Sequence, residues 1–466
     1  MSLKSLFSAR DMTLGSPWKR IGEFALPMVL GNIAQQLYNT ADSVIVGIYV
    51  GDNALAAVGS ASPILNLLLA LFVGVSTGAG IVISQHFGAK DRKGLSCAIG
   101  NCISLALIAT LAIMFVGPMI TRPFLDLLGT PDSIIDWCTA YLKIYFYGIV
   151  GFFMYNMLSG VLRGLGDSFS ALLFLLVSAA LNVGLDLLFV GVFHMGVPGV
   201  SLATVIAQGL SSVLCYWKLM RMRDIFDLNL KNMKIVPAMS LRIMKLGIPS
   251  GITQAIMATA GMVVLNLTNA MGKTVVACNV IVMRVDGFAM MPNFTFGQAM
   301  SVYTGQNVGA GKLDRVSKGT KQGAALALAF ATAITLTLLF CGPFLFRMFT
   351  DTQFLIDLAT RMIRLMAVGY ICIAITQVLG GVMRGAGDTV SPMWISIIST
   401  IIIRVPLAYI LAELTKNEAY PHGQPIALFG SLMISWVLGM VLSIIVYAIG
   451  KWRKKMLASQ ANYSRD

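Results

Sequence analysis

The chain has 466 residues, of which 57% are hydrophobic and 12% are charged, and its formal net charge is +14. A soluble domain carries about 25% charged residues, so this composition excludes a soluble enzyme, a fibrous protein and a disordered chain. A polytopic membrane protein remains, in agreement with a mean hydropathy of +0.80. A spanning helix needs about 20 apolar residues, so the chain has room for roughly a dozen spans with their loops.

Twelve apolar segments bounded by charge, glycine or proline are predicted to be membrane-spanning helices. In chain order they cover residues 21–50, 54–86, 95–121, 134–161, 169–192, 199–219, 243–272, 275–306, 319–346, 354–383, 391–413 and 427–450. Several are longer than a perpendicular span requires, so we expect them to be tilted or bent. Prolines inside apolar runs are expected to kink their helices. They are Pro27, Pro249, Pro292 and Pro406.

The distribution of basic residues predicts the orientation of these helices. Assigning the loops to alternate sides puts 25 Lys and Arg on the side of both termini, four on the other side and five inside spans. Cytoplasmic loops carry the excess of Lys and Arg in membrane proteins, so both termini are predicted to be cytoplasmic. The expected location is the bacterial inner (plasma) membrane. The positive charge therefore indicates topology, and no nucleic-acid partner is expected.

Other sequence signals point away from an enzyme. No GxxxxGK[ST] phosphate loop, catalytic triad or cluster with metal-ligand spacing is visible. The seven cysteines lie mostly inside apolar segments and are interpreted as small packing residues. The first 20 residues lack an apolar stretch before a small-residue cleavage site, so no signal peptide is indicated. We expect a protein that is not an enzyme and needs no cofactor.

The two halves of the chain resemble each other at a shift of about 221 residues. Three segments of the first half match the second: 26–27 with 248–249, 85–89 with 306–310, and 162–168 with 383–389. Each half holds six predicted helices, so the halves have the same orientation and are related by an axis along the membrane normal. The predicted fold is an all-α polytopic membrane protein with twelve transmembrane helices in two pseudo-twofold-related six-helix lobes. A duplication retained only for packing is the alternative.

This repeat predicts the domain organisation. Residues 1–20 are expected to form a cytoplasmic N-terminal segment, and residues 221–242 a cytoplasmic linker between the lobes. The predicted lobes are 21–220 (helices 1–6) and 243–450 (helices 7–12), and 451–466 is the predicted cytoplasmic tail. Two similar lobes around a central cleft are a structural basis of alternating access.

Ionisable residues inside a spanning helix are costly and are candidates for function. At 1.5 Å per residue, Asp42 lies about 12 Å and Asp186 about 9 Å from the outer ends of their helices. Asn182 precedes Asp186 by four positions, so both lie on one helix face. Thr204 and Tyr141 lie near the outer starts of their segments. Five polar groups on four helices are thus predicted in the outer half of the first lobe.

Two carboxylates that share one apolar site cannot both be ionised cheaply. A proton should sit on one of them, or Na⁺ between them with Asn182 and Thr204 oxygens as hard ligands. The repeat shifts Asp42 onto Val263 or Val264 and Asp186 onto Leu407 or Ala408, while Asn182 falls near Arg404. The second half lacks the carboxylates, so ion coupling is assigned to the first. A buried Asp42 or Asp186 that is satisfied by its neighbours and has no coupling role is the alternative.

The substrate cleft is predicted to lie among helices 1, 7 and 8. The candidates are Gln35, Tyr38, Met257, Arg284, Asp286, Met290 and Phe294. The sequence holds 28 Met, and flexible, polarizable Met side chains suit a surface that accepts ligands of many shapes. Arg284 and Asp286 are two positions apart and cannot face each other along a helix, so each needs another partner. Ordinary apolar packing is the alternative for the remaining residues.

The motif R-G-x-G-D-[ST] occurs twice, at 163–168 and 384–389, in predicted cytoplasmic loops. Its glycines allow tight turns, and Arg163 could pair with Asp167. We interpret both loops as structural.

Several motifs, in this order and spacing, make the whole chain resemble the multidrug and toxic compound extrusion (MATE) transporters. They are Leu26-Pro27, the segment 41–47 (ADSVIVG), 85–89 (QHFGA), the two R-G-x-G-D-[ST] loops, 182–186 (NVGLD) and 199–204 (GVSLAT). The resemblance implies a secondary antiporter that exports organic, often cationic, compounds in exchange for H⁺ or Na⁺. It also implies a cation or proton site at the positions of Asp42, Asn182, Asp186 and Thr204, with Tyr141 beside it. Pro27 is expected to be the kink that moves when the ion is loaded.

The expected partners are a small organic substrate and the lipid bilayer, and we expect a monomer. Two other functions stay open at this point. A flippase for a lipid-linked precursor shares the wider superfamily and shows a cationic cavity, which Arg284 and Arg404 would allow, but the Asp cluster argues against it. A receptor or scaffold that does not transport would need neither the duplicated bundle nor the intramembrane Asp–Asn–Asp set.

Overall fold

The structure is a computed structural model that describes residues 9–127, 129–229, 233–418 and 420–463. Within these residues the chain is helical, and no strand is assigned beyond an isolated bridge between Asn417 and Tyr420. The helices are α2 (Pro17–Tyr49), α3 (Asp52–Gly88), α4 (Arg92–Leu127), α5 (Asp132–Tyr147), α6 (Ile149–Gly164), α7 (Ser168–Asp186), η1 (Leu187–Val192), α8 (Gly196–Met220), α9 (Pro237–Ala270), α10 (Lys273–Gly309), α11 (Leu313–Arg347), α12 (Gln353–Gly385), α13 (Val390–Ser396), η3 (Ile397–Arg404), α14 (Val405–Leu414), α15 (Ile426–Ile449) and α16 (Lys451–Tyr463). The segments η1 and η3 are π-helical.

The prediction of a polytopic helical protein is confirmed. Apart from at most two residues at an end, each of the twelve predicted segments lies in one of these helices or in a consecutive group of them. Among the described residues, ten helices are long and apolar enough to cross a membrane, and the bent pair α5–α6 brings the number to 11. The first predicted segment corresponds to α2, a 33-residue helix that is not among these ten. The protein is therefore a multi-pass membrane protein.

The chain divides into two compact units. The first contains the described residues of Met1–Asp11 together with Leu26–Gly251, and the second contains Met12–Ala25 and Ile252–Asp466 up to the last described residue. The long helices α2 and α9 are each shared between the units. In both helices the division falls within three residues of a proline, Pro27 in α2 and Pro249 in α9. Both helices run through these prolines, as α10 does through Pro292.

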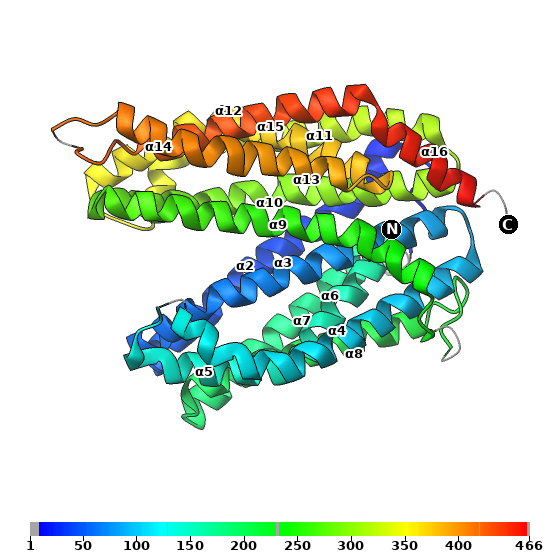
Figure 1. Cartoon of the computed structure of the whole chain (residues 1–466), viewed down its shortest axis with the longest axis horizontal. Coiled ribbons are helices and arrows are strands. Elements are labelled where there is room, and N and C mark those ends of the chain that lie inside the picture. Colours follow the sequence, from blue (N-terminus) through cyan, green and yellow to red (C-terminus); the bar gives the residue numbers. More distant parts are fainter. Residues whose placement is uncertain (1–8, 128, 230–232, 419, 464–466) are drawn as a thin grey trace. The chain divides into compact units, whose positions relative to one another are not determined.

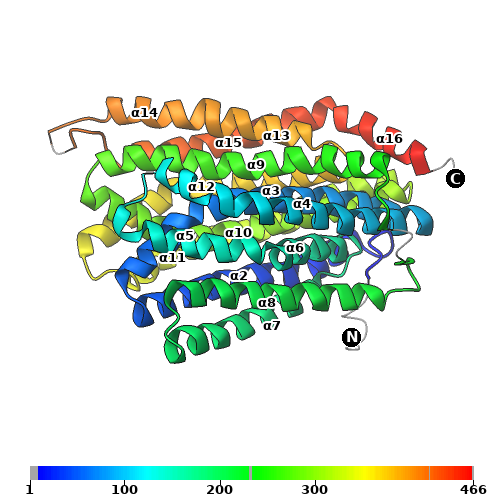
Figure 2. The ribbon, with the colours of Figure 1, turned by 60° about the horizontal axis from the view of Figure 1, so that its bottom comes forward.

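The first unit is held together by close contacts of small residues. Helices α3 and α6 approach so closely that a Cβ on Gly164 would lie 2.8 Å from the carbonyl oxygen of Gly80. The Ser76 hydroxyl crosses the same interface and donates to the Asn156 carbonyl at 2.7 Å. Helices α7 and α8 pack side by side (Figure 2), and the Ser211 hydroxyl of α8 donates to a carbonyl of α7. Small residues let helix backbones approach where no hydrophobic effect drives association.

The second unit packs α10, α12, α11 and α15 along one another (Figure 1). Helices α10 and α12 meet at two glycines, and a Cβ on Gly381 would lie 2.2 Å from the carbonyl oxygen of Gly297. The aromatic rings of Tyr370 and Trp436 join α12 to α15, with their centroids 5.6 Å apart. This unit contains all of the second repeat from Ile252 onward.

The segment 134–161 was expected to be one helix, and this expectation is wrong. The structure breaks it at Gly148 into α5 and α6, which are bent by 54°. The break lies against α8, because a Cβ on Gly148 would come within 2.1 Å of the Val205 side chain. Glycine permits this close approach because it has no Cβ. In an apolar segment, a glycine that breaks a helix has the same local sequence pattern as one that packs inside it.

Both R-G-x-G-D-[ST] loops are tight turns with a left-handed glycine. The φ angle is 85° at Gly166 and 91° at Gly387. Asp167 caps α7 by accepting hydrogen bonds from the Ser170 N–H at 2.9 Å and from the Ser170 hydroxyl at 2.7 Å. The charged neighbour of Asp167 is Lys218, with Nζ 3.7 Å from Oδ2, so the expected pairing with Arg163 is wrong.

The second loop has the same capping arrangement but a different cation. Asp388 is fully buried and accepts from the Ser391 N–H and hydroxyl at 3.2 and 2.6 Å. Its cation is Lys455, whose Nζ donates to Oδ1 at 2.7 Å from helix α16. The sequence predicts only a tail at 451–466, because the charged sequence of this helix carries no apolar pattern.

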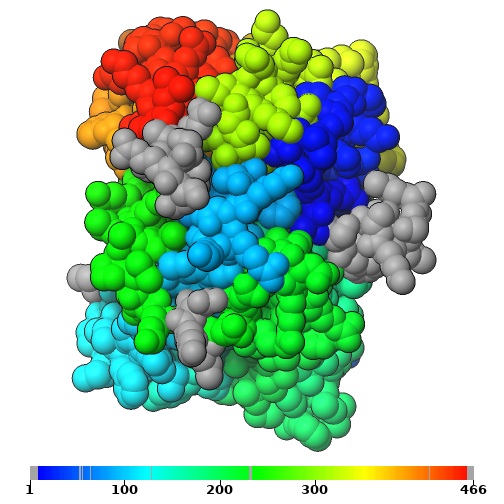
Figure 3. All heavy atoms as spheres, turned by 90° about the vertical axis from the view of Figure 1, so that its right-hand side faces the viewer, coloured from blue at the N-terminus to red at the C-terminus, as the bar shows by residue number. Residues whose placement is uncertain are grey.

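The segment from Met12 to Gly15 packs against the start of α11, within the second unit. Arg315 of α11 donates to three groups: Asn307 Oδ1 at 3.1 Å, the Gly15 carbonyl at 2.9 Å and the Met12 carbonyl at 3.1 Å. Figure 3 shows this contact as blue N-terminal atoms against the yellow-green atoms that surround the start of α11. Two basic residues at the start of α11, Lys312 and Arg315, thus fix the segment around Met12 and Gly15 by hydrogen bonds.

The cap at Asp167 gives a stability prediction. Replacing Asp167 with alanine removes both hydrogen bonds to Ser170 and the ion pair with Lys218, so we expect a loss of about 1 kcal/mol. Thermal unfolding of the purified protein, followed by intrinsic fluorescence, would measure the effect. Asp132→Ala is the matched control, because Asp132 is exposed in the first turn of α5 and makes no capping bond. Equal unfolding temperatures for the two variants would contradict the capping role.

Candidate functional site

Four of the predicted ion-site residues lie together in the first unit. Asp42 comes from α2, Asn182 and Asp186 from α7, and Thr204 from α8. The carboxyl groups of Asp42 and Asp186 are within hydrogen-bonding reach of each other. Asn182 joins the group when its amide is oriented to satisfy both neighbours: Nδ2 donates to Asp186 Oδ2 at 2.8 Å, and Oδ1 accepts from the Thr204 N–H at 3.1 Å.

Local helix geometry brings these side chains together. Asn182 and Asp186 are one turn apart on α7, so both face the same side, and both are fully buried. Asp186 is the last α-helical residue, and the π-helical segment η1 begins at Leu187. Thr204 is 9% exposed, and its hydroxyl donates to the Val200 carbonyl of its own helix at 3.1 Å. The Thr204 oxygen therefore keeps lone pairs available for another partner. π-helical segments such as η1, which begins directly after Asp186, are frequent at functional sites.

Two tyrosines border the carboxyl pair. Tyr141 of α5 is 5% exposed and lies close enough to interact electrostatically with Asp42 and Asp186. Tyr38, one turn before Asp42 on α2, lies close to the Thr204 side chain and interacts electrostatically with Asp42. We had predicted Tyr38 for the substrate cleft, although its spacing of four residues from Asp42 already puts it on the face of the carboxyl pair. We call these six residues the carboxyl cluster: Tyr38, Asp42, Tyr141, Asn182, Asp186 and Thr204.

The carboxyl cluster has the chemistry of a site for a small cation. Oδ1 of Asp42 and Oδ1 of Asp186 are buried and have no hydrogen-bond partner among the described residues. An ionised buried oxygen without a partner is costly, and a bound proton or a hard cation removes that cost. The oxygen atoms of Asp42, Asp186, Asn182 and Thr204 form the donor set that Na⁺ accepts. The same atoms can hold a proton shared between the two carboxyl groups.

The residues predicted to line the substrate cleft divide between the units. Gln35 and Tyr38 lie in the first unit, and Met257, Arg284, Asp286, Met290 and Phe294 lie in the second. Within the second unit, Met290 is buried, Phe294 packs partly buried against the core, and Arg284 is exposed. That all seven line one cleft stays a prediction.

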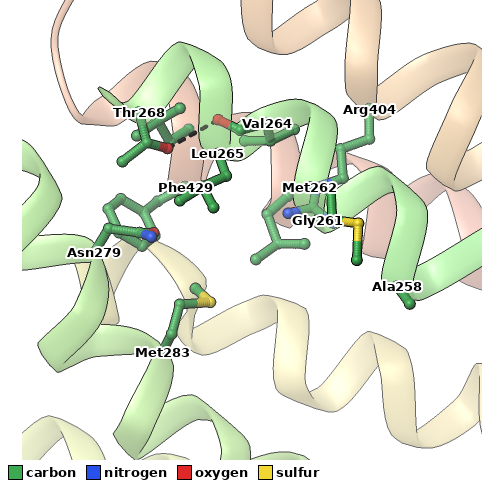
Figure 4. A pocket seen from close by; sticks show the side chains of 12 residues that line it. Ala258, Gly261, Met262, Val264, Leu265, Thr268, Asn279, Met283, Arg404 and Phe429 are labelled. Atoms are coloured by element: carbon green, nitrogen blue, oxygen red, sulfur yellow. Dashed lines mark hydrogen bonds between the residues drawn. The ribbon is translucent and has the colours of Figure 1, made fainter. Parts of the chain in front are cut away.

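Asp286 is hydrogen-bonded to a residue on another helix. Because Asp286 and Arg284 are two positions apart, they cannot face each other along α10. The Tyr370 hydroxyl of α12 donates to Asp286 Oδ1 at 2.9 Å, and Asp286 also interacts electrostatically with Arg404. Nothing in the sequence pattern pointed to Tyr370, because it lies in an ordinary apolar stretch of α12. Arg404 is the last residue of η3 and lines a cavity in the second unit (Figure 4).

Comparisons with known proteins agree with this architecture. The family model MatE matches the chain twice, at residues 27–188 and 249–410. The chain is 27% identical over 429 residues to "Probable multidrug resistance protein YoeA" of Bacillus subtilis (strain 168), covering 90% of this chain and 92% of that protein. It is 24% identical to "Probable multidrug resistance protein NorM" of Thermotoga maritima, with 95% and 94% covered.

Solved structures show the same fold. A structure described as "Outward-facing conformation of a multidrug resistance MATE family transporter of the MOP superfamily" superposes with a TM-score of 0.86 at 22% identity, covering 97% of this chain and 98% of that one. A "Crystal structure of MATE in complex with MaL6" gives a TM-score of 0.87 at 21% identity, with 97% and 99% covered. Because the family model covers both halves of the chain and the fold agrees over nearly its whole length, this chain belongs to the MatE family of multidrug and toxic compound extrusion transporters.

Proposed function

We propose that this protein is a secondary active antiporter that exports organic, cationic or amphipathic compounds in exchange for H⁺ or Na⁺ by alternating access. The observation that carries the proposal is the carboxyl cluster. Asp186 is fully buried and Asp42 lies partly buried beside it, and each has a buried oxygen atom without a hydrogen-bond partner among the described residues. Such a pair binds a cation or proton reversibly, which a coupling site must do.

The division of α2 supports a mechanism for the coupling. Residues up to Ala25 pack with the second unit and those from Leu26 with the first, so the change of partner occurs next to Pro27. Proline removes one backbone hydrogen bond and weakens the helix at that point. Asp42 lies on the same helix, in the part that belongs to the first unit. Ion loading at Asp42 would bend α2 near Pro27 and reduce the space for substrate, which is then released outward.

Residue chemistry on the second unit supports the proposed cleft. Met257, Met290 and Phe294 supply adaptable apolar surface, and Arg284 and Asp286 supply charge, while Gln35 and Tyr38 belong to α2. The names of the relatives, multidrug resistance proteins, agree with a broad range of organic substrates. We further propose that both termini are cytoplasmic, since Lys and Arg gather on the side of the termini. The proposed location is the inner membrane, and the proposed state is a monomer.

A flippase for a lipid-linked precursor is the alternative. The observation that favours it is Arg404, a cation that lines a cavity of the second unit. The carboxyl cluster of the first unit has no role in that activity, so a requirement for the cluster distinguishes the two functions.

The proposal can be tested in liposomes that contain the purified protein. A fluorescent organic cation is loaded, and its export is followed while an inward gradient of H⁺ or of Na⁺ is imposed separately. We expect one of the two gradients to accelerate export well above that of protein-free liposomes, and its collapse by an ionophore to remove the effect. Export that responds to neither gradient, together with translocation of a lipid-linked precursor, would establish the flippase instead.

A further inference from the structure

The second unit contains a cavity whose charge is opposite to that of the carboxyl cluster. It has a volume of about 300 Å³, which is the lower end of the range for small-molecule sites. Its walls come from α9, α10, the end of η3 and α15 (Figure 4). Most of the lining is apolar, and three residues bring polar side chains to it: Thr268, Asn279 and Arg404. We call it the Arg404 cavity.

Arg404 is the only charged residue of this lining. Its Nε atom is buried and has no hydrogen-bond partner among the described residues. Figure 4 shows its side chain reaching from η3 toward Gly261 of α9. A guanidinium at membrane depth is costly, and an unsatisfied buried donor adds to that cost. Asp286 interacts with Arg404 electrostatically but is itself engaged by the Tyr370 hydroxyl.

The repeat places this cavity at the counterpart of the carboxyl cluster. The two stretches matched by the family model begin 222 residues apart and also end 222 residues apart. At that shift Asp42 corresponds to Val264 and Asn182 to Arg404, and both counterparts line the cavity. The second unit thus has an apolar residue in place of the carboxylate and a guanidinium in place of the amide of the proposed cation site.

The backbone around Arg404 departs from a regular α-helix, which affects the direction of the Arg404 side chain. Pro406 follows two residues later and lacks the N–H that would bond to the carbonyl of Ile402. The helix is π-helical from Ile397 to Arg404, which changes the direction of the side chains relative to a regular helix. The rim of the cavity is accessible, because Met262 and Leu265 are each 45% exposed. A ligand can therefore reach Arg404 from the surface of the unit.

We propose that the Arg404 cavity binds the anionic group of an amphipathic organic molecule, a carboxylate or a phosphate, with its apolar part against the methionines and aliphatic side chains. A guanidinium presents a planar fork that matches either anion through paired, charge-assisted hydrogen bonds. Asn279 and Thr268 supply further polar contacts, and flexible Met262 and Met283 adapt to the apolar part. The proposal rests on the proposed export function and extends its substrates to anionic and zwitterionic amphiphiles.

Binding to purified protein in nanodiscs of zwitterionic lipid tests the proposal without any ion gradient. The probes are a xanthene dye with a free benzoate and the methyl ester of the same dye, and fluorescence anisotropy reports the affinity. Arg404→Gln should weaken binding of the acid about tenfold, since one charge-assisted contact is lost, and leave the ester unchanged. Arg364→Gln is the matched control, because Arg364 is an exposed arginine of the same unit outside the cavity.

A second variant and a competition measurement complete the test. Arg404→Lys retains the charge but loses the planar fork, so it should weaken binding of the acid about threefold if the glutamine variant does not fold. Competition by an alkyl carboxylate or by an alkyl phosphate of equal chain length then identifies which anion the cavity prefers, and either result supports the proposal. Equal affinity of wild type and both Arg404 variants for the acid, or equal loss for acid and ester, would overturn it.

This outcome is independent of the export function. A protein that binds the acid through Arg404 but shows no gradient-driven export would retain the cavity and refute antiport. If the protein exports an organic cation under a gradient but the Arg404 substitution leaves binding of the acid unchanged, antiport is supported and the anion site is refuted.

Discussion

Replacing Asp42 with asparagine is expected to abolish gradient-driven efflux. Asparagine is nearly isosteric with aspartate, yet it can neither take up a proton at neutral pH nor supply a negative charge for Na⁺. The carboxyl cluster would keep its shape, with Asn182 still placed between Asp186 and Thr204. We expect the export rate under an H⁺ or Na⁺ gradient to fall to that of protein-free liposomes, while the purified variant still binds the organic cation.

Asp126→Asn is the control for this prediction. Asp126 is an exposed carboxylate near the end of α4, and it lies 3.9 Å from the exposed Arg122. Surface pairs of this kind contribute little, so this variant should export like the wild type. Full gradient-driven export by the Asp42 variant, with folding verified by size-exclusion chromatography, would remove Asp42 from the coupling mechanism and leave a carboxyl group with a structural role.

Replacing Gly381 with leucine is expected to destabilise the protein strongly. At this point α12 crosses α10, and a Cβ would lie 2.2 Å from the carbonyl oxygen of Gly297. The obstructing atom is backbone, which cannot rotate away as a side chain does, so the two helices must separate. We expect a loss of about 3 kcal/mol, visible as a lower unfolding temperature and a lower yield of folded protein.

The control is Gly287→Ala on α10, where a Cβ would meet no atom within 4 Å. A glycine inside a helix is less stable than alanine by about 0.5–1 kcal/mol, so this substitution should leave the unfolding temperature equal or higher. If Gly381→Leu unfolded at the same temperature as Gly287→Ala, the close crossing of α10 and α12 would be wrong.

The positions of the helices and five of the six members of the carboxyl cluster could be predicted from short-range patterns and from the repeat. Apolar length defines a membrane span, and a spacing of four residues places Asn182 and Asp186 on one face without knowledge of the fold. The repeat gave the counterpart of Asn182 near Arg404 by counting alone. These features depend on the chain within a few turns or on a comparison of the chain with itself.

The remaining features depend on packing between distant segments. The break at Gly148 lies against Val205 of a distant helix, and the ion pair of Asp388 depends on Lys455 in a helix that has no apolar pattern. The Arg404 cavity is the space left where four elements meet, and no local sequence specifies such a space. Likewise, the hydrogen bond from Tyr370 to Asp286 joins residues 84 positions apart.

In the proposed mechanism, substrate and coupling ion oppose each other through Asp42 and Asp186. Isothermal titration calorimetry measures this most directly, with an organic cation titrated into the purified protein in buffers of different ionisation enthalpy and at several Na⁺ concentrations. We predict that binding of the organic cation releases protons, or weakens as Na⁺ is raised, and that Asp42→Asn removes the dependence. Binding that is independent of buffer, pH and Na⁺ in the wild-type protein would contradict the account.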